Sequence, residues 1–159
     1  MANLRFSECG IWVAERRKIE EIADVTEQPK RKDTIMSKSN TICWTDIPVK
    51  NLDRAIQFYS AVLGQPVNKQ SVPGMEFGLL PHAEDNVSGC LCQTADNQPS
   101  EQGPLIYFSV EGRLDEAAQA ARKGGGTVLK DKHPIGPYGF RAVIRDTEGN
   151  RVALHSHTP

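Results

Sequence analysis

The chain has 159 residues, of which 38% are hydrophobic and 25% are charged, and its formal net charge is −1. This length suits one domain or two small fused modules, and the near-neutral charge excludes the strongly basic surface of a typical nucleic-acid-binding protein. No apolar run approaches the roughly 18 residues that a membrane-spanning helix needs, so we expect no membrane partner.

Residues 1–40 differ from the rest because they mix acidic and basic side chains and hold few large apolar ones after Trp12. Residues 11–25 could form one amphipathic helix, followed by a charged linker at 28–33. A transit peptide would be poor in acidic residues, and this segment is not. We therefore predict a poorly structured or helical N-terminal extension, with Met36 as the functional start of the fold.

Residues 42–64 predict a strand that leads into a helix. The first half is short, apolar and rich in β-forming residues, and it ends near Pro48. Asn51 can cap the following helix, and Gly64 is a typical helix stop. The apolar residues between them recur at helical spacing: Leu52, Ala55, Ile56, Tyr59, Val62 and Leu63.

Three short apolar stretches come next and are predicted as strands: residues 66–72, 75–80 and 87–93. Residues 94–103 are rich in polar residues, Pro and Gly, which is typical of a linker. The four cysteines form no Cys-x-x-Cys pair, which favours a reduced, cytoplasmic protein. Cys90 and Cys92 would share one face of the third strand, where core packing is the simplest expectation.

The second half of the chain repeats this order. Residues 104–110 predict a strand, and 113–123 predict an Ala-rich helix that ends at the glycines 124–126. The helix would bury Leu114, Ala117, Ala118 and Ala121. Three further strands are predicted: residues 127–130, 139–145 and 150–157.

An internal repeat relates the two halves. Leu52-Asp53-Arg54-Ala55 aligns with Leu114-Asp115-Glu116-Ala117 at an offset of 62 residues. A β-α-β-β-β unit that occurs twice explains this spacing. One such unit would leave the concave face of its sheet exposed, whereas two can enclose a cleft. The sequence therefore predicts an α+β fold of paired modules with mixed, curved sheets.

Residues 47–64 carry the pattern Ile-Pro-Val-x-x-Leu-Asp-Arg-Ala-x-x-Phe-Tyr-x-x-Val-Leu-Gly. This pattern resembles the opening of a vicinal-oxygen-chelate domain, the fold of glyoxalase I, extradiol dioxygenases and the bleomycin and fosfomycin resistance proteins. The turn at residues 146–150 resembles the Asp-Pro-Asp-Gly-Asn hairpin late in such domains. The resemblance implies a domain at residues 41–157, with module 1 at 41–93 and module 2 at 104–157.

In the metal-dependent members of that superfamily, four strands each contribute one ligand, and the metal polarises the substrate. Three of the corresponding positions here carry no metal-binding atom: Trp44, Leu105 and Ala153. The remaining position falls on the strand at 87–93, whose only candidates are Cys90, Cys92 and Gln93. Because an open catalytic site needs about three protein donors, we expect no metal and no cofactor.

The alternation of side chains along strands predicts what lines the cleft instead. It would be mainly apolar with a few polar groups, as is typical of a small-molecule site: Trp44, Asp46, Leu105, Tyr107, Ala153 and His155. The alternative is that Trp44 and Tyr107 simply fill the interior. The loop at 130–140 could present Tyr138 or Phe140 to a ligand, or could be a stiff surface connection.

Asp46 is the one candidate for a catalytic role. A carboxylate that faces an apolar interior needs a partner, and Arg141 is a plausible one. Asp46 could then act as a general acid or base, or could form a structural ion pair near the strand end. His155 and His157 lie close to the end of the chain, where solvated histidines are more typical than metal ligands.

Three functions follow from these expectations. The leading one is metal-independent binding of a small, partly apolar molecule, either for sequestration or for a reaction that the sequence does not specify. The second is a metal-dependent lyase, like lactoylglutathione lyase, or a dioxygenase with displaced ligands such as His155, His133 or Cys92. The third is a non-catalytic interaction module whose cleft is filled by its own side chains. The resemblance also implies a homodimer.

Overall fold

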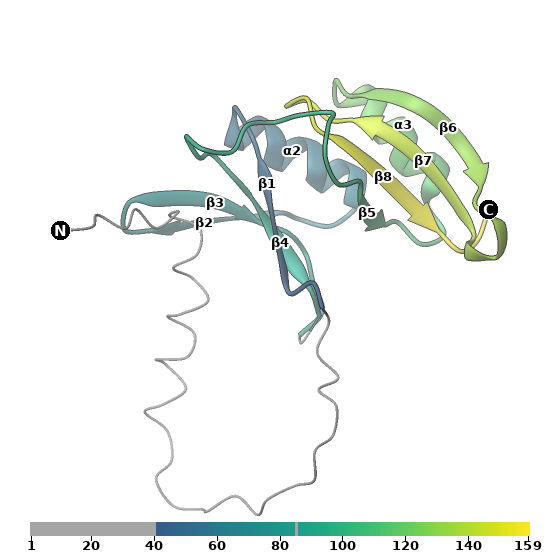
Figure 1. Ribbon diagram of the computed structural model, residues 1–159, viewed down its shortest axis with the longest axis horizontal. Coiled ribbons are helices and arrows are strands. Elements are labelled where there is room, and N and C mark those ends of the chain that lie inside the picture. Colours follow the sequence, from purple (N-terminus) through teal and green to yellow (C-terminus); the bar gives the residue numbers. More distant parts are fainter. Residues whose placement is uncertain (1–40, 85) are drawn as a thin grey trace, which may run out of the picture. The chain divides into compact units, whose positions relative to one another are not determined.

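The computed structural model describes residues 41–84 and 86–159. The helix, the linker and the start of the fold that we predicted within residues 1–40 lie outside the described residues. The helices and strands belong to one compact unit, Trp44–Pro159, and Figure 1 shows their order along the chain.

The first module builds a four-stranded sheet with one helix. Its elements are β1 (Trp44–Pro48), α2 (Leu52–Leu63), β2 (Asn68–Val72), β3 (Met75–Leu79) and β4 (Ser88–Cys92). The strand order in this first sheet is β1-β4-β3-β2, with β1 parallel to β4 and the other pairs antiparallel.

The second module repeats this plan. Its elements are β5 (Ile106–Ser109), α3 (Leu114–Lys123), β6 (Thr127–Pro134), the short 3-10 helix η2 (Gly136–Tyr138), β7 (Phe140–Arg145) and β8 (Arg151–Ser156). The second sheet has the order β5-β8-β7-β6, again with its first strand parallel to its last. The predicted α+β fold of two β-α-β-β-β modules is therefore confirmed.

The first helix begins and ends as predicted. The Asn51 side chain accepts a hydrogen bond from the Arg54 N–H at 2.9 Å, and Gly64 ends the helix with a φ of 67°. The second helix ends differently, because Gly124 has a φ of −79° and Gly125 adopts the positive value. In a run of three glycines, more than one residue can adopt the left-handed conformation, so the surrounding contacts decide which one does.

Both helices pack into one hydrophobic core. α2 covers one face of the first sheet, α3 covers one face of the second, and the two helices contact each other (Figure 1). The core includes Tyr59 from α2 and Ala117 from α3, both with no exposed surface. Phe58, which we did not place on the buried face, is also buried. Its ring packs edge-on against the Tyr59 ring, with 5.3 Å between the two ring centroids.

The turn at residues 146–150 ties the two modules together. The Tyr59 hydroxyl donates to Asp146 Oδ2 at 2.7 Å, and the backbone N–H groups of Lys50 and Asn51 each donate to Glu148 Oε2 at 2.9 Å. Asn150 Nδ2 donates to the Pro48 carbonyl at 2.9 Å. The predicted turn, with Gly149 at a positive φ of 109°, is confirmed, and its side chains also anchor the start of α2.

The loop that we predicted at residues 130–140 is shorter in the structure, because β6 continues to Pro134. β6 pairs with β7 through two register shifts, which accommodate the extra residues as bulges. β6 is also an edge strand, where a proline is tolerated. Only η2 and its flanking residues remain as a loop.

Gly139 gives a stability prediction for this loop. Its φ is 90°, and a Cβ atom at this position would overlap the Ser156 carbonyl oxygen, whereas Gly136 has a φ of 70° and open space around it. Gly139→Ala should therefore lower the free energy of unfolding by about 2–3 kcal/mol. Gly136→Ala should lower it by only about 1 kcal/mol, the backbone term alone. Urea denaturation of both variants measures the difference, and equal losses would contradict this account.

Among the described residues, no helix is both long and apolar enough to cross a membrane.

Candidate functional site

On the first sheet, Asp46 lies at the centre of a small polar group. Its Oδ1 atom accepts hydrogen bonds from the Trp44 indole N–H at 2.9 Å and from the Cys90 thiol at 3.3 Å. The parallel register of β1 and β4 explains this contact, because Asp46 lies directly opposite Cys90, and Cys92 follows on the same face. The group therefore forms from two neighbouring strands of one module.

Arg141 is not the partner of Asp46, contrary to our expectation. Arg141 lies on β7 in the second sheet, whereas Asp46 lies on β1 in the first. The two residues are therefore held by separate modules. The partners that Asp46 has instead are the neutral N–H and S–H groups of its own sheet, and its role as a general acid or base stays a prediction.

The three positions where the superfamily places metal ligands do not fit a metal. The Trp44 indole nitrogen donates a hydrogen bond, and Leu105 and Ala153 have hydrocarbon side chains. A different donor set does exist on the first sheet, because ligand atoms of Asp46, Cys90 and Cys92 all lie within 4.8 Å of one another. Two thiols and a carboxylate are suitable ligands for a zinc-like ion, but all three come from one module.

The second sheet presents side chains in rows on the side away from α3. In one row, Tyr107 on β5 lies opposite Ala153 on β8, which lies opposite Val143 on β7. In the next row, His155 lies between Ser109 and Arg141. We call this side the open face, because the Tyr107 side chain is 44% exposed there. Ala153 and Val143 in the same row are buried, so Tyr107 supplies the accessible apolar surface of that row.

Arg141 is held in place by two neighbours on the open face. Its Nε donates to His133 Nε2 at 3.1 Å, and its Nη1 donates to the Tyr107 hydroxyl oxygen. The guanidinium also lies 5.8 Å from the centre of the Tyr107 ring, within the range of a cation–π contact. His133 Nδ1 in turn lies 2.8 Å from the Asp131 carbonyl oxygen, so Nδ1 carries the proton and Nε2 is free to accept.

His155 on β8 and His157, which follows the end of that strand, are already engaged. His155 Nε2 lies 2.6 Å from the Tyr138 carbonyl oxygen, to which it can only donate. His157 contacts Glu111 through both its backbone N–H, at 2.9 Å, and its ring, at 3.1 Å. The hydrogen bond from the His157 backbone, together with those from its ring and from Thr158, lowers the pKa of Glu111 to about 2. A metal at His133 or His155 would have to displace these contacts.

The remaining predicted site residues are placed less favourably. Leu105 precedes β5 and is half-buried, and Phe140 packs against the hydrophobic core. Phe140 therefore lies on the α3 side of β7, while Arg141 next to it lies on the open face. The structure brings Tyr107, Arg141, Ala153 and His155 together on the second sheet and Trp44 and Asp46 on the first. β1 and β5 are each the outer strand of their own sheet.

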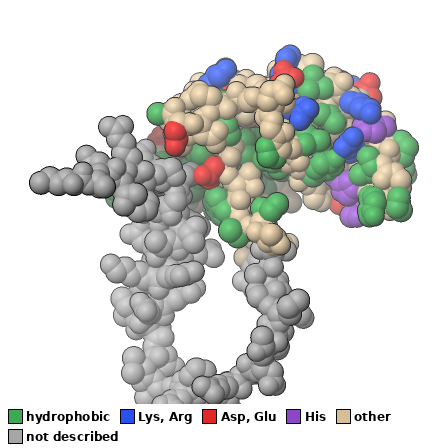
Figure 2. Space-filling model, viewed as in Figure 1, with side chains coloured by type: hydrophobic (Ala, Val, Ile, Leu, Met, Phe, Trp, Pro, Cys, Tyr) green, Lys and Arg blue, Asp and Glu red, His purple; other side chains and the backbone are tan. Residues whose placement is uncertain are grey.

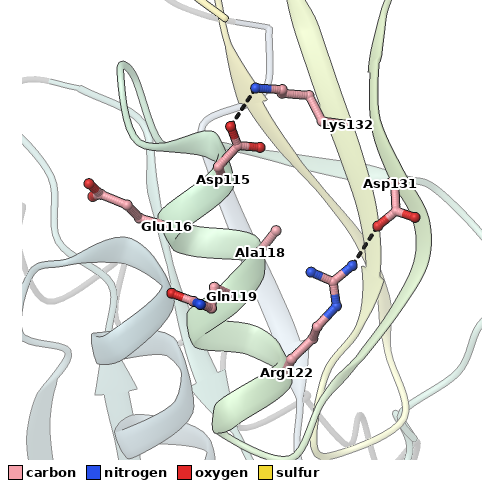
Figure 3. A pocket seen from close by; sticks show the side chains of 7 residues that line it. All are labelled: Asp115, Glu116, Ala118, Gln119, Arg122, Asp131 and Lys132. Carbon is pink, nitrogen blue, oxygen red and sulfur yellow. Dashed lines mark hydrogen bonds and ion pairs between the residues drawn. The ribbon is translucent and has the colours of Figure 1, made fainter.

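A pocket between α3 and β6 lies away from all of these residues (Figure 3). Its charges are matched within the pocket, because Lys132 pairs with Asp115 and Arg122 pairs with Asp131. Glu116 on its rim pairs with Arg113 at 3.3 Å. A ligand would find no unmatched charge here, so the pocket does not qualify as the functional site.

Two features of these groups were missed from the sequence. The contact between Asp46 and Cys90 depends on the register of two parallel strands that are 44 residues apart, and no local pattern encodes that register. The contact between His133 and Arg141 depends on the continuation of β6 beyond Lys130. Residues 130–133 are all charged or polar, so no alternation with apolar residues indicated that longer strand.

Comparison with known proteins identifies relatives over most of the chain. The family model described as the Glyoxalase/Bleomycin resistance protein/Dioxygenase superfamily matches residues 41–154. CFP32 from Mycobacterium bovis, which carries the provisional name of a glyoxylase, is 27% identical over 117 residues. That match covers 73% of this chain but only 44% of CFP32, so the chain spans less than half the length of this relative.

Solved structures show the same fold at low identity. A glyoxalase/bleomycin resistance protein from Albidiferax ferrireducens has a TM-score of 0.59 and 18% identity, and the match covers 74% of this chain and 98% of that one. A glyoxalase I variant from Zea mays has a TM-score of 0.56 and 20% identity, over 72% of this chain and 45% of the other. At these identities the similarity concerns the fold alone.

Proposed function

Because the chain belongs to the Glyoxalase/Bleomycin resistance protein/Dioxygenase superfamily, we propose that it binds a small, partly apolar molecule. The proposed site is the open face of the second sheet, and binding there is independent of a metal. The observation that carries this proposal is the exposed Tyr107 ring, which lies next to the partly exposed Arg141 and His155 on the same face. Aromatic and apolar side chains with a few fixed polar groups are typical of small-molecule sites.

Metal independence is supported by the three ligand-equivalent positions, which carry an indole and two hydrocarbon side chains. The exposure of Tyr107 also favours binding over the alternative in which the cleft is filled by the protein's own side chains. The proposal covers both sequestration and conversion of the bound molecule. The homodimer implied by the resemblance stays a prediction.

Binding of naphthalene-based probes tests this proposal. The full chain, dialysed against EDTA, should bind 2-naphthamide or 2-naphthoate in a thermal-shift or calorimetric titration, because ligand binding stabilises the folded state. Tyr107→Ala should weaken the binding about tenfold, since loss of one aromatic contact costs up to about 1.5 kcal/mol and 1.4 kcal/mol corresponds to a factor of ten. Val87→Ala, which removes an exposed apolar side chain outside the second sheet, should leave binding unchanged. Failure of both probes to bind the wild-type chain at millimolar concentration would contradict the proposal.

A second candidate is favoured by one observation, the proximity of Asp46, Cys90 and Cys92. In this alternative the chain is a metal-dependent lyase or dioxygenase that uses displaced ligands on the first sheet. Elemental analysis of the purified chain before and after EDTA separates the two candidates. A stoichiometric divalent metal, whose removal abolishes probe binding, would support the second and overturn the first.

A further inference from the structure

The charge of the open face has a consequence for the ligand. Most described arginines pair with a carboxylate: Arg54 with Glu148, Arg113 with Glu116, Arg122 with Asp131 and Arg145 with Glu101. Arg141 differs, because its hydrogen-bond partners within the described part of the chain are a histidine ring and a phenol. Its positive charge is therefore not neutralised by an ion pair with any residue that the structure describes.

The contacts of Arg141 fix its orientation and leave donors available. His133 occupies Nε and Tyr107 occupies one hydrogen of Nη1, whereas Nη2 makes no hydrogen bond with the described residues. One hydrogen of Nη1 and both hydrogens of Nη2 remain. The guanidinium can therefore donate one hydrogen from each terminal nitrogen, Nη1 and Nη2, to the same planar acceptor. A carboxylate has two oxygens at the matching separation.

The Glu111 carboxylate, which lies near the end of β8, forms no ion pair with Arg141. Glu111 accepts hydrogen bonds from His157 and from Thr158, whose N–H and hydroxyl donate at 3.2 and 3.1 Å.

A second arginine reinforces the positive character of the face. Arg151 lies two residues before Ala153 on β8, so both side chains lie on the same face, and its Nε is buried without a hydrogen-bond partner among the described residues. Figure 2 shows histidine side chains next to Lys and Arg side chains near the C-terminus of the chain.

We propose that the open face selects a small aromatic carboxylate, whose anionic group is bound end-on by Arg141 and whose ring contacts the exposed Tyr107 ring. This inference rests on the proposed function and names the class of molecule that the site takes. His133 acts as a positioning residue, since it contacts Arg141 and fixes the direction of the guanidinium. The open side of the Tyr107 ring supplies the apolar surface that a free inorganic anion would not use.

Two probes that differ only in charge test the inference on the full chain. 2-Naphthoate and 2-naphthamide share one ring system, but only the first carries a carboxylate. Calorimetric titration should give a Kd for 2-naphthoate at least about tenfold lower than that for 2-naphthamide, the range expected for a hydrogen bond to a charged group. Arg141→Gln should remove this difference by weakening 2-naphthoate alone. The same change at Arg122, which is exposed and pairs with Asp131 in the pocket between α3 and β6, should preserve the difference.

Arg141→Lys gives a second variant for the case in which Arg141→Gln fails to fold. It keeps the charge but loses the planar pair of donors, so the preference for 2-naphthoate should fall by several fold without disappearing. Equal affinities of the wild-type chain for the two probes would overturn the inference and leave the proposed function standing. A preference that survives in Arg141→Gln would also overturn it. Binding of neither probe would overturn the inference and the proposed function together.

Discussion

Replacement of Asp146 by alanine is expected to lower the free energy of unfolding by about 3–5 kcal/mol. The Asp146 side chain accepts five hydrogen bonds of 2.7–2.9 Å, from the Tyr59 hydroxyl, the Asn150 side chain and three backbone N–H groups of its own turn. Tyr59 has no exposed surface and Asp146 is 4% exposed, so water cannot easily replace the lost acceptor. Because whole domains are stable by about 5–15 kcal/mol, this one change should bring the fold close to unfolding.

Urea denaturation followed by circular dichroism measures this effect. Asp131→Ala is the matched control, because the Asp131 carboxylate is 82% exposed and pairs with the exposed Arg122. Its loss should change the free energy of unfolding by at most about 1 kcal/mol. If the two variants lose the same stability, the turn at residues 146–150 is not the anchor that the hydrogen bonds indicate.

Glu148→Gln should destabilise the chain by about 2–4 kcal/mol at pH 7. The Glu148 side chain has no exposed surface, and its oxygens accept hydrogen bonds from Arg54 Nε at 2.8 Å and from the backbone N–H groups of Lys50 and Asn51. An amide in this position would direct its own N–H bonds at these donors. Glu101→Gln is the matched control, since Glu101 is 41% exposed and pairs with Arg145 on the surface, and it should lower the free energy of unfolding by at most about 1 kcal/mol.

The effect of Glu148 should also depend on pH. Burial alone would raise the pKa of this carboxyl, but the hydrogen bonds from Arg54, Asn51, Thr147 and Lys50 outweigh burial and lower the pKa to about 2 from the usual 4.5. A group whose pKa is lowered by folding stabilises the folded state above its unfolded pKa, and this stabilisation is lost as the pH falls toward the folded value. The difference between wild type and Glu148→Gln should therefore be constant above pH 5 and shrink between pH 4.5 and pH 2. A difference that stays unchanged down to pH 2 would contradict the assignment.

The fold could be predicted from the sequence because its local signals agree with one another. The helical spacing of Leu52, Ala55 and Tyr59, the Asn51 cap and the Gly64 stop all point to the same helix, and the structure has it. Similarly, the four residues predicted to face inward from the second helix are all buried. The end of β6 was predicted less well, because bulges let a strand continue through residues that locally favour a loop.

The candidate site was predicted only in part, because its residues meet through pairing between distant strands. Alternation along a strand correctly placed Tyr107, Ala153 and His155 on one face, since that requires only the period of two. The partner of Asp46 could not be deduced in this way. Phe140 and Arg141 are neighbours on β7, and their side chains point to opposite faces, Phe140 into the core and Arg141 to the open face. Because both side chains are large, the sequence alone does not tell which of them points to which face.

The hydrogen bonds around the turn at residues 146–150 make the two halves unequal, although both have the same topology. The two carboxylates, Asp146 and Glu148, come from the second half, and the first half supplies the donors that they bind, Lys50, Asn51, Arg54 and Tyr59. Asn150 adds one hydrogen bond in the other direction, to the Pro48 carbonyl. Two identical copies of either half would place acceptor against acceptor or leave the donors unmatched. These hydrogen bonds therefore make the two halves mutually dependent, and neither could be exchanged for a second copy of the other.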